Sequence, residues 1–503
     1  MVWRKTEFLL LVVLGAGCSS NSTADIDAPL AEATLTVVSA WGQVTSLPTG
    51  IDCGATCSHT FPQLTQVTLN AVSQEGYTFS SWRGGGCDGH SGSCQVTLSS
   101  DTTVTAEYTQ ICDTSAPLFD SGGTNGWARV PVTNQMPDGP TDLAFVPGTS
   151  DFIVATRNGT LHYFSSSCDP QTTIDLTGAG VPITSGGEQG LLNITFHPDW
   201  AKNQLVFIYH TSSSDPINSI SRLELTVNAG EMTVANPVRV IDFIKRTGAA
   251  NHNGGGLVFA PDKTLLASVG EGGSNISAQR TNNLLGAVVR ITPALTGDTA
   301  YDYAIPPGNM FSATNPRCFA TAESSSDCPE LLAIGLRNPY TMTIDGNVVY
   351  LGDVGTTFEE INSFDFRDNT VNFGWATHDG PANTAPFTDP ILSYRRDEEP
   401  TITFRNDDPA CSGQQCTVDT ASIMIGDVYR GARYEGLLQG TLVWADFYQG
   451  FVRGLGVTDA GAPTGASSHL VHRTATDVMV SGPDGYYYMA SLFNRRVYRL
   501  ERP

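Results

Sequence analysis

One histidine stands in a glycine-rich loop near the middle of the chain, in the run GAANHNGGGLVFAPD of residues 248–262. Glycine and asparagine neighbours carry no bulky side chains that would bury an imidazole, so we expect His252 to face open space. An imidazole titrates near neutral pH and can take or release a proton there. The structural alternative is that a lone histidine in such a loop only caps a turn.

The elements that must position this loop form a recurring unit. From about residue 117, a glycine- or proline-marked turn, a strand, a second turn and a second strand follow one another repeatedly. Six such units lie at residues 141–164, 190–211, 255–272, 340–355, 428–455 and 476–500. Self-similar strand units of this kind predict either a closed ring of sheets or a large β-sandwich assembly.

A ring of sheets has a direct consequence for the chemistry. The innermost strands and their loops converge at one end of the central channel, where residues far apart in sequence meet. We therefore expect a scattered site that takes one or two residues from each sheet.

The loops entering four of the units read SGGEQGLLNITFHPDW, NHNGGGLVFAPD, PELLAIGLRNPYTMTID and MIGDVYRG. Together with NFGW at 372–375, these motifs in this order make residues 117–503 resemble the glucose/sorbosone dehydrogenase family. Its soluble members are sugar dehydrogenases that use pyrroloquinoline quinone (PQQ) on a six-bladed β-propeller. The resemblance therefore favours an all-β fold with a six-bladed propeller over the sandwich.

The resemblance implies roles for several loop residues. His252 stands where the family keeps the general base that takes the anomeric hydroxyl proton as hydride leaves for the quinone. Arg337 and Asn338 match a pair over the quinone, where a guanidinium stabilises developing negative charge. The other implied cofactor contacts are Glu188 and Gln189 in SGGEQGLL and Asn251 beside His252.

A calcium ion that clamps the cofactor is also implied. Gly355 and Thr356 in GDVGTTFEEIN fall where family members offer backbone carbonyls to that ion, and Glu360 is a further candidate ligand. Oxygen ligands in a tight loop suit a hard cation. The structural alternative is an ordinary glycine turn.

The chain departs from the family pattern in the cofactor contacts. Glu188 replaces a glutamine, and Arg430 replaces a lysine. Thr474 and Thr476, in HRTATDVMV, replace two arginines that grip the cofactor carboxylates. Each lost charge-assisted contact is worth about 1.5–3 kcal/mol, so these changes weaken the case for cofactor binding. Arg337 as an interblade salt bridge and Arg430 as a surface residue are the structural alternatives.

Two functions follow from these observations. The first is an exported PQQ-dependent oxidoreductase that oxidises the anomeric hydroxyl of an aldose, with PQQ and Ca²⁺ as cofactors and a small sugar as substrate. The second is a non-catalytic surface propeller that binds carbohydrate or protein and has lost PQQ, as relatives of the hedgehog-interacting protein within this subgroup bind rather than catalyse. The sequence holds no nicotinamide or flavin fingerprint and no Walker loop, and it does not identify an electron acceptor.

The N-terminal region predicts export. Residues 1–18 hold Arg4 and Lys5, a short apolar stretch and a lipoprotein-like cleavage site at Cys18, with ordinary secretion as the alternative. Residues 19–33 are polar and predict a flexible tether. Residues 34–111 alternate as short strands and resemble a divergent internalin-type B repeat, which implies a spacer or adhesion module.

Charge and cysteine content agree with a protein outside the cytoplasm. The 503 residues include 27 Lys and Arg against 50 Asp and Glu, and a net charge of −23 repels nucleic acid and anionic lipid. The membrane is therefore expected as a partner only through a lipid on Cys18. Ten cysteines remain, and an oxidising compartment would let them pair as 53/57, 87/94, 112/168, 318/328 and 411/416, with a zinc site as the alternative.

Overall fold

The computed structural model describes residues 31–54, 56–74, 76–90, 92–112, 127–165, 167–213, 217–228, 230–245, 248–319, 321–396, 421–434, 436–465, 468–472 and 476–501. The expected signal segment, most of the expected tether, Thr474 and the pair Cys411/Cys416 lie outside these residues. Within them, no helix is long and apolar enough to cross a membrane.

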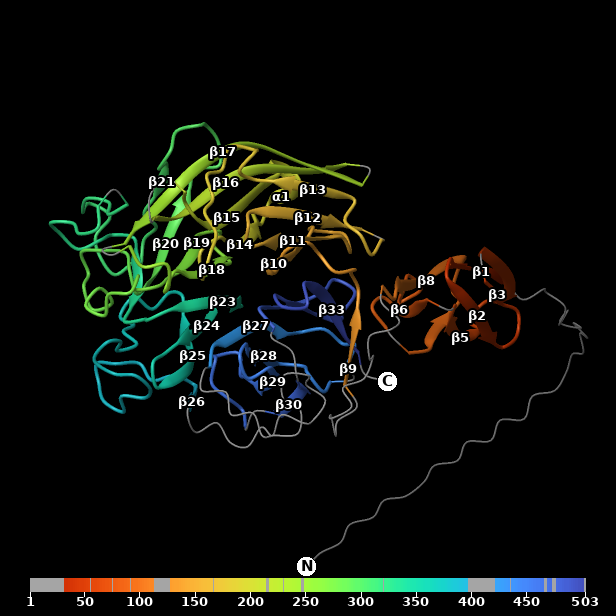
Figure 1. Ribbon diagram of the computed structural model, residues 1–503. Coiled ribbons are helices and arrows are strands. Elements are labelled where there is room, and N and C mark those ends of the chain that lie inside the picture. Colours follow the sequence, from red (N-terminus) through yellow and green to blue (C-terminus); the bar gives the residue numbers. More distant parts are fainter. Residues whose placement is uncertain are drawn as a thin grey trace, which may run out of the picture.

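The N-terminal module consists of two four-stranded sheets (Figure 1). The first contains β1 (Glu32–Ser39), β4 (Thr56–Pro62), β6 (Tyr77–Arg83) and β8 (Thr102–Gln110). The second contains β2 (Gly42–Leu47), β3 (Asp52–Cys53), β5 (Gln66–Ser73) and β7 (Cys94–Thr97). Alternate residues of β1, among them Leu35 and Val37, are buried in a core around Trp82, as the period-2 pattern requires.

The main body consists of six further sheets, and its first three follow one another along the chain. The first contains β10 (Pro140–Phe145), β11 (Phe152–Thr156), β12 (Thr160–Phe164) and β13 (Thr172–Asp175). The second contains β14 (Leu191–Phe196), β15 (Leu205–Thr211), β16 (Ile217–Asn228) and β17 (Glu231–Ile244), with the short helix α1 (Trp200–Asn203) after β14. The third contains β18 (Gly254–Phe259), β19 (Leu265–Val269), β20 (Ala287–Pro293), β21 (Tyr303–Ala304) and β22 (Leu331–Ile334).

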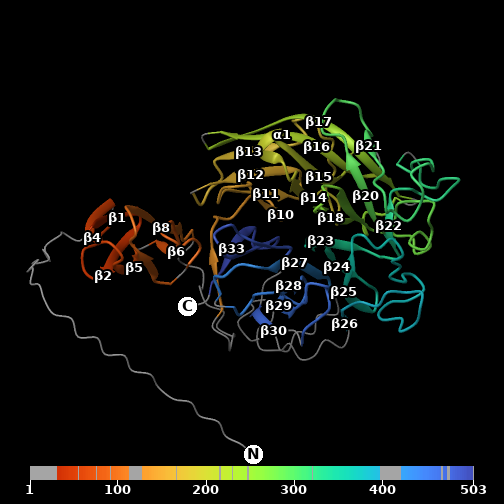
Figure 2. The ribbon, with the colours of Figure 1, turned by 180° about the vertical axis from the view of Figure 1, so that it is seen from behind.

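The other three sheets complete the main body (Figure 2). The fourth contains β23 (Pro339–Asp345), β24 (Val348–Val354), β25 (Phe358–Asp365) and β26 (Leu392–Arg395). The fifth contains β27 (Ile423–Tyr429), β28 (Thr441–Asp446), β29 (Phe451–Gly456) and β30 (Ser468–His472). The sixth contains β31 (Val478–Ser481), β32 (Tyr487–Ser491), β33 (Arg496–Glu501) and β9 (Ala128–Pro131).

The second strand of each of these six sheets is buried along its whole length: β11, β15, β19, β24, β28 and β32. Such strands read as continuous apolar runs, for example LVFIYHT in β15, because both of their faces pack against neighbouring sheets. The first strands contact one another in the order β10, β14, β18, β23, β27, β31 and back to β10. The all-β prediction is therefore confirmed.

The sixth sheet joins the two ends of the main body. Its outer strand β9 precedes all the others in sequence and pairs antiparallel with β33 at the C-terminus. The backbone N–H of Val132 then donates to the carbonyl of Val497 at 2.9 Å. The first and last segments of the main body are thus held in one sheet.

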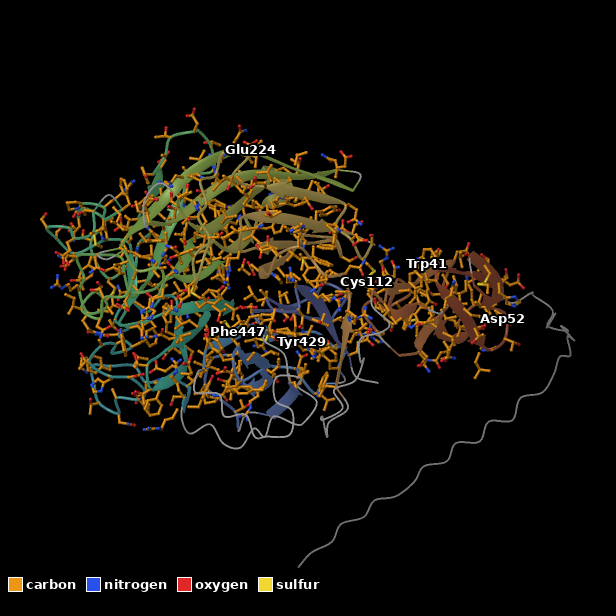
Figure 3. The ribbon with its side chains drawn as sticks, in the orientation of Figure 1. Trp41, Asp52, Cys112, Glu224, Tyr429 and Phe447 are labelled. Carbon is orange, nitrogen blue, oxygen red and sulfur yellow. A yellow bond between two sulfur atoms is a disulfide. The ribbon has the colours of Figure 1, made fainter. Side chains whose placement is uncertain are left out.

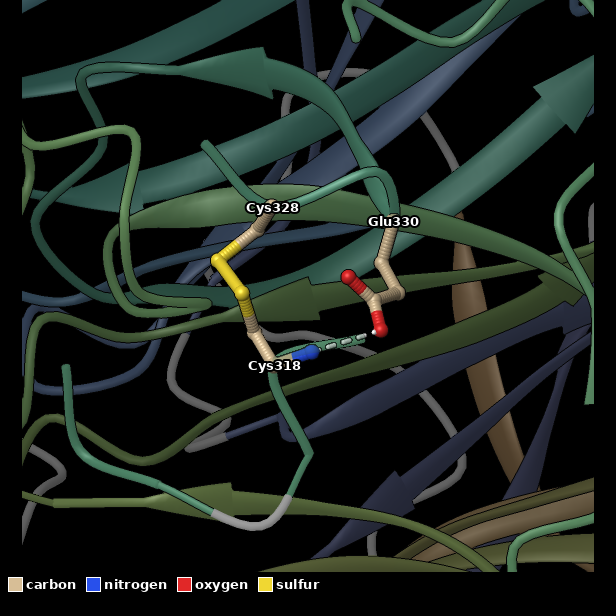
Figure 4. A group of neighbouring side chains, drawn as sticks. All are labelled: Cys318, Cys328 and Glu330. Atoms are coloured by element: carbon tan, nitrogen blue, oxygen red, sulfur yellow. Dashed lines mark hydrogen bonds between the residues drawn. A yellow bond between two sulfur atoms is a disulfide. The ribbon is translucent and has the colours of Figure 1, made fainter. Parts of the chain in front are cut away.

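Four of the five expected disulfides are present, linking Cys53 to Cys57, Cys87 to Cys94, Cys112 to Cys168 and Cys318 to Cys328. Figure 4 shows that Glu330 lies beside the last of these, where its Oε1 accepts the Cys318 N–H at 3.0 Å. Because both sulfur atoms are bonded to each other, this group provides no thiolate for a metal.

The module is fixed to the main body by the bond from Cys112 to Cys168, and Figure 3 labels Cys112 at this junction. The fully buried Arg499 of β33 donates to the Thr109 hydroxyl of the module. Tyr486 donates its hydroxyl to the Phe79 carbonyl at 3.2 Å. The junction therefore combines one covalent link with hydrogen bonds between the two parts.

Candidate active site

A cavity of about 680 Å³, called here the loop-end cavity, lies where the entry loops of several sheets meet. In an antiparallel sheet the first strand starts at the edge where the second strand ends, so both segments supply side chains to the same place. The lining residues are Arg157, Gly187, Glu188, Ala250, Asn251, His252, Arg337, Asn338, Tyr340, Val354, Arg396, Ala421, Ser422, Met424, Phe447, Tyr448, Asp477, Leu492 and Phe493. The expected scattered arrangement is what the structure shows.

His252 lies at the cavity wall in a backbone conformation that few side chains adopt, with φ of 53°. Its backbone N–H donates to Glu188 Oε2 at 2.7 Å. The next strand passes so closely that a Cβ on Gly270 would lie 2.2 Å from the His252 carbonyl oxygen. The glycines of this region therefore hold the histidine backbone in place rather than only clearing space around its ring.

The ring of His252 has a fixed partner. Nδ1 forms a hydrogen bond with Oε1 of Glu271, a residue at the end of the same sheet's second strand whose side chain is fully buried. When Nδ1–H donates to a carboxylate, the neutral ring keeps its lone pair on Nε2. This pairing is the arrangement that a histidine general base requires.

Glu188 connects the loops of the site through hydrogen bonds. Its Oε2 accepts both the His252 N–H and the Asn338 Nδ2–H, the latter at 3.2 Å. Asn338 Oδ1 in turn accepts the Gly254 N–H at 3.0 Å. A carboxylate in place of glutamine thus gives two donors one charged acceptor, which ties three entry loops together.

Arg337 is held at the cavity wall by two contacts. Its Nη1 donates to the Val354 carbonyl at 2.7 Å, and the guanidinium carbon lies 5.4 Å from the centroid of the Trp375 ring. Its backbone N–H donates to Asp353, whose pKa burial and the neighbouring Glu360 raise to about 8. The guanidinium is therefore preorganised rather than free to move toward solvent.

Lys245 is a site residue that the sequence did not reveal. It follows β17, is nearly buried, and donates to the Ala249 carbonyl at 2.9 Å and to Asn253 Oδ1. Burial lowers its pKa to about 8, against the opposing effect of Glu188 and Glu271. Through these two hydrogen bonds Lys245 holds the loop that carries His252 in place. No sequence motif around Lys245 indicated that it would do so.

Two further arginines and an aspartate line the cavity. Arg157 donates from Nη1 to the Gly187 carbonyl at 2.8 Å, and its Nε is buried without a hydrogen-bond partner among the described residues. Arg396 donates from Nη1 to the Gly355 carbonyl at 2.7 Å. Burial raises the pKa of Asp477 to about 8. Asp477 directly follows Thr476 in the segment HRTATDVMV. This segment therefore contributes Asp477 to the cavity wall instead of the predicted threonines.

Several predicted site residues do not line the cavity. The Arg430 side chain is on the far side of its unit, where it pairs with Asp345, so its assignment as a cofactor contact is not supported by this geometry. Thr476 is fully buried behind the wall. Gln189 forms a backbone bridge to Gly186. Of the predicted set, the cavity brings together His252, Arg337, Glu188, Asn251 and Asn338.

The three predicted calcium ligands are arranged differently from a cation site. The Gly355 carbonyl already accepts the Arg396 guanidinium, and Thr356 is exposed. Both carboxylate oxygens of Glu360 are used, one by the Gly380 N–H at 2.7 Å and one by Asn362 Nδ2 at 3.1 Å. As arranged, these residues do not fit a calcium ion.

Comparisons with known proteins extend over most of the main body. Residues 137–489 match the family model described as Glucose / Sorbosone dehydrogenase. The chain belongs to the glucose/sorbosone dehydrogenase family. Residues 34–112 match the Divergent InlB B-repeat domain, in agreement with the resemblance seen in the sequence.

Individual members of the glucose/sorbosone dehydrogenase family and related proteins are distant in sequence. The aldose sugar dehydrogenase YliI of Escherichia coli is 25% identical over 396 residues, which cover 75% of this chain and 93% of that protein. The HIPL2 protein of Arabidopsis thaliana is 27% identical over 218 residues, 40% of this chain and 29% of that protein.

Solved structures of sugar dehydrogenases share the fold. The soluble aldose sugar dehydrogenase of Escherichia coli in its apo form gives a TM-score of 0.57 at 20% identity, covering 75% of this chain and 100% of that one. The PQQ-bound aldose sugar dehydrogenase of Streptomyces coelicolor gives 0.54 at 22% identity, covering 75% and 98%.

The donor set of the cavity fits a flat anionic cofactor such as PQQ. Three guanidinium groups line it: that of Arg157, which follows β11 of the first sheet, and those of Arg337 and Arg396, which precede and follow the strands of the fourth sheet. Guanidinium is the side chain best suited to hold carboxylates. These three groups provide positive charge in the cavity, although Thr474 and Thr476 stand where the family has two arginines.

Proposed function

We propose that this protein is a sugar dehydrogenase that oxidises the anomeric hydroxyl of an aldose in the loop-end cavity. The observation that carries the proposal is that His252 and Arg337 both line the cavity while the His252 ring is bound by the fully buried Glu271. We also infer that the six sheets are the six blades of a propeller, because their first strands contact in a closed order.

The residues divide the chemistry between them. Nε2 of His252 takes the hydroxyl proton as the anomeric C–H bond breaks and the carbon–oxygen double bond of the lactone forms. Glu271 holds the ring and stabilises its positive charge once it is protonated. PQQ, when bound, supplies the acceptor for the hydride, that is, for two electrons and one proton. Arg337, Arg157 and Arg396 would hold its anionic groups.

The experiment is a titration of the purified full chain with PQQ followed by aldose-dependent reduction of a dye. We expect a PQQ-dependent activity whose kcat falls by about 10²–10⁴-fold in His252→Ala, since that is the usual contribution of proton transfer. PQQ binding, followed by absorbance, should persist in this variant. His90→Ala, an exposed histidine of the module, is the matched control. Absence of turnover at saturating PQQ with every aldose tried would refute the proposal.

A second function is a non-catalytic binding propeller. The arginine-to-threonine changes and the similarity to the HIPL2 protein favour it. It predicts that aldoses bind without turnover and that His252→Ala leaves their Kd unchanged. Calorimetric sugar binding in the wild type and His252→Ala therefore separates the two functions.

Export with a lipid anchor on Cys18 is part of the proposal. Support comes from the short apolar segment before Cys18 and from the four disulfides among the described residues, which form in oxidising compartments. Cys18→Ser should move the protein from the membrane fraction to the soluble fraction, as a fractionation blot would show.

A further inference from the structure

The loop that connects β24 to β25 begins at Gly355 and is bound by a cationic side chain of the same protein, Arg396. The Nη1 group of Arg396 donates to the Gly355 carbonyl at 2.7 Å, and the Arg396 backbone N–H donates to the Thr357 carbonyl at 2.9 Å. Arg396 therefore binds two carbonyl groups of this loop, those of Gly355 and Thr357, which are two residues apart. Its guanidinium stands on the cavity wall, with 22% of the side chain exposed.

The carboxylates around this loop are committed to donors within the fold. Asp379 accepts the Thr357 N–H at 2.7 Å and the Phe358 N–H at 3.2 Å. Fully buried Glu359 accepts the Ile423 N–H at 2.9 Å and lies 3.3 Å from Arg396 Nη1. Burial raises the pKa of Glu359 well above its usual value, and the nearby Arg396 guanidinium opposes that shift.

We propose that Arg396 takes the place of the calcium ion in this member of the family, so that the loop is ordered and the cofactor is held without a metal. The inference rests on the proposed function for the cofactor, but the state of the loop can be measured without it. A guanidinium within hydrogen-bond distance of the Gly355 carbonyl repels a dication and fills the direction from which the ion would bind. It also faces the cavity, where it offers a charge to an anionic ligand.

The test uses chelator-treated full-length protein and two readouts, namely calcium binding by calorimetry and the thermal unfolding midpoint with calcium or with EDTA. We expect the wild type and Glu360→Gln to give the same calcium calorimetry, without binding at this site. We expect the unfolding midpoint of the wild type to be the same in calcium and in EDTA. PQQ affinity should be equal in calcium and in EDTA. A wild type whose PQQ affinity falls tenfold or more on chelation would overturn the proposal.

Variants separate the role of the charge from that of folding. Arg396→Ala should weaken PQQ binding about 10-fold or more, and millimolar calcium but not magnesium should restore part of it. Arg396→Lys keeps the charge, so it should stay independent of calcium even if the alanine variant does not fold. Arg367→Ala, an exposed arginine of the same sheet that pairs with Asp365, is the matched control. Calcium dependence of the lysine variant equal to that of the alanine variant would contradict the proposal.

The two proposals fail in different ways. If no PQQ binds under either condition, the proposed function fails, whereas the calorimetric and thermal readouts still report on Arg396. If PQQ binds only with calcium, the dehydrogenase stands and the inference about Arg396 falls.

Discussion

At the scale of single residues, the polar side chains of the site hold one another in place by hydrogen bonds. His252 is fixed through its backbone by Glu188 and through its ring by Glu271. Lys245 lies under the same loop, where both glutamates act on its pKa. His252 is therefore positioned by a small network of polar contacts, and the motif NHNGGG did not reveal the two glutamates or Lys245.

Asp477 provides a test of the electrostatics of the cavity. Burial raises its pKa from 3.8 to about 8, while the Leu492 N–H and Arg157 oppose the shift. Between about pH 4 and pH 8 the folded state keeps a proton that the unfolded state has lost. This group therefore makes the free energy of unfolding fall as the pH rises through that window.

Asp477→Asn keeps an oxygen that accepts the Leu492 N–H but removes the titration. We expect the decline in unfolding free energy between pH 4 and pH 8 to become shallower, by at most about 1.4 kcal/mol per pH unit. Urea unfolding across this range measures it. Asp298→Asn, on an exposed bend, is the control, and parallel profiles for Asp477→Asn and wild type would contradict the expectation.

The sequence predicted the part of the site that lies in glycine-rich entry loops. His252, Arg337 and Asn338 all belong to motifs whose order along the chain indicated one common location. Glu271 and Arg396 follow strands of their sheets and have no motif, and only tertiary pairing shows what they contact. Arg430 does not line the cavity and pairs with Asp345 instead, because its position in sequence does not report which end of the sheet its side chain occupies.

At the scale of elements, bulges shape the edge that carries the site. The pairing of the first and second strands shifts register in five of the six sheets, near the start of the first strand in four of them and between Ile425 and Val428 of β27 in the fifth. Bulges re-aim side chains and are common beside active sites. In the third sheet the shift lies between Gly254 and Leu257, directly after the loop of His252.

Gly270→Ala tests the close approach of two strands behind His252. The added Cβ would lie 2.2 Å from the His252 carbonyl oxygen and 2.7 Å from the Gly254 nitrogen, both backbone atoms that cannot rotate away. We expect a loss of about 1–3 kcal/mol in stability and a larger proportional loss of kcat. Gly248→Ala, where a Cβ meets open space, should change neither. Calorimetry and dye reduction measure both, and an active, stable Gly270→Ala would show that the loop moves freely.

Five of the six predicted units begin at or near the first strand of a sheet, whereas the unit at residues 428–455 begins at the end of β27 and covers β28 and β29. The alternation of apolar runs and turns identified β10 with β11 and β31 with β32, because these strands are adjacent in sequence. The outer strands were not predicted in detail, since they are shorter or more exposed and their patterns are weaker. The pairing of β9 with β33 could not be predicted, because it joins segments at opposite ends of the main body.

At the scale of the whole molecule, the module and the main body are separate in sequence but joined in space. Between them lies a groove of about 460 Å³ that includes the stacked rings of Trp41 and Tyr77. The bond between Cys112 and Cys168 spans the junction and closes a long stretch of chain.

Replacing this cystine by Cys112→Ser with Cys168→Ser should cost about 2–5 kcal/mol of stability, because it removes a constraint over 56 residues. Aldose oxidation should be unchanged, since neither residue lines the loop-end cavity. The control pair Cys53→Ser with Cys57→Ser closes only 4 residues and should cost less. Differential scanning calorimetry compares the two, and an equal cost would argue against the long-range role of the first bond.

The shared sheet of β9 and β33 also governs how the molecule can be made. In the order of synthesis, β9 precedes its partner β33 by about 370 residues, the separation of the paired Arg129 and Leu500, which is about three quarters of the chain. Contacts so distant in sequence form late and slowly. Until the segment of β33 has been synthesised, β9 has no partner in the sixth sheet, so a chain truncated before Arg496 would leave that strand unpaired.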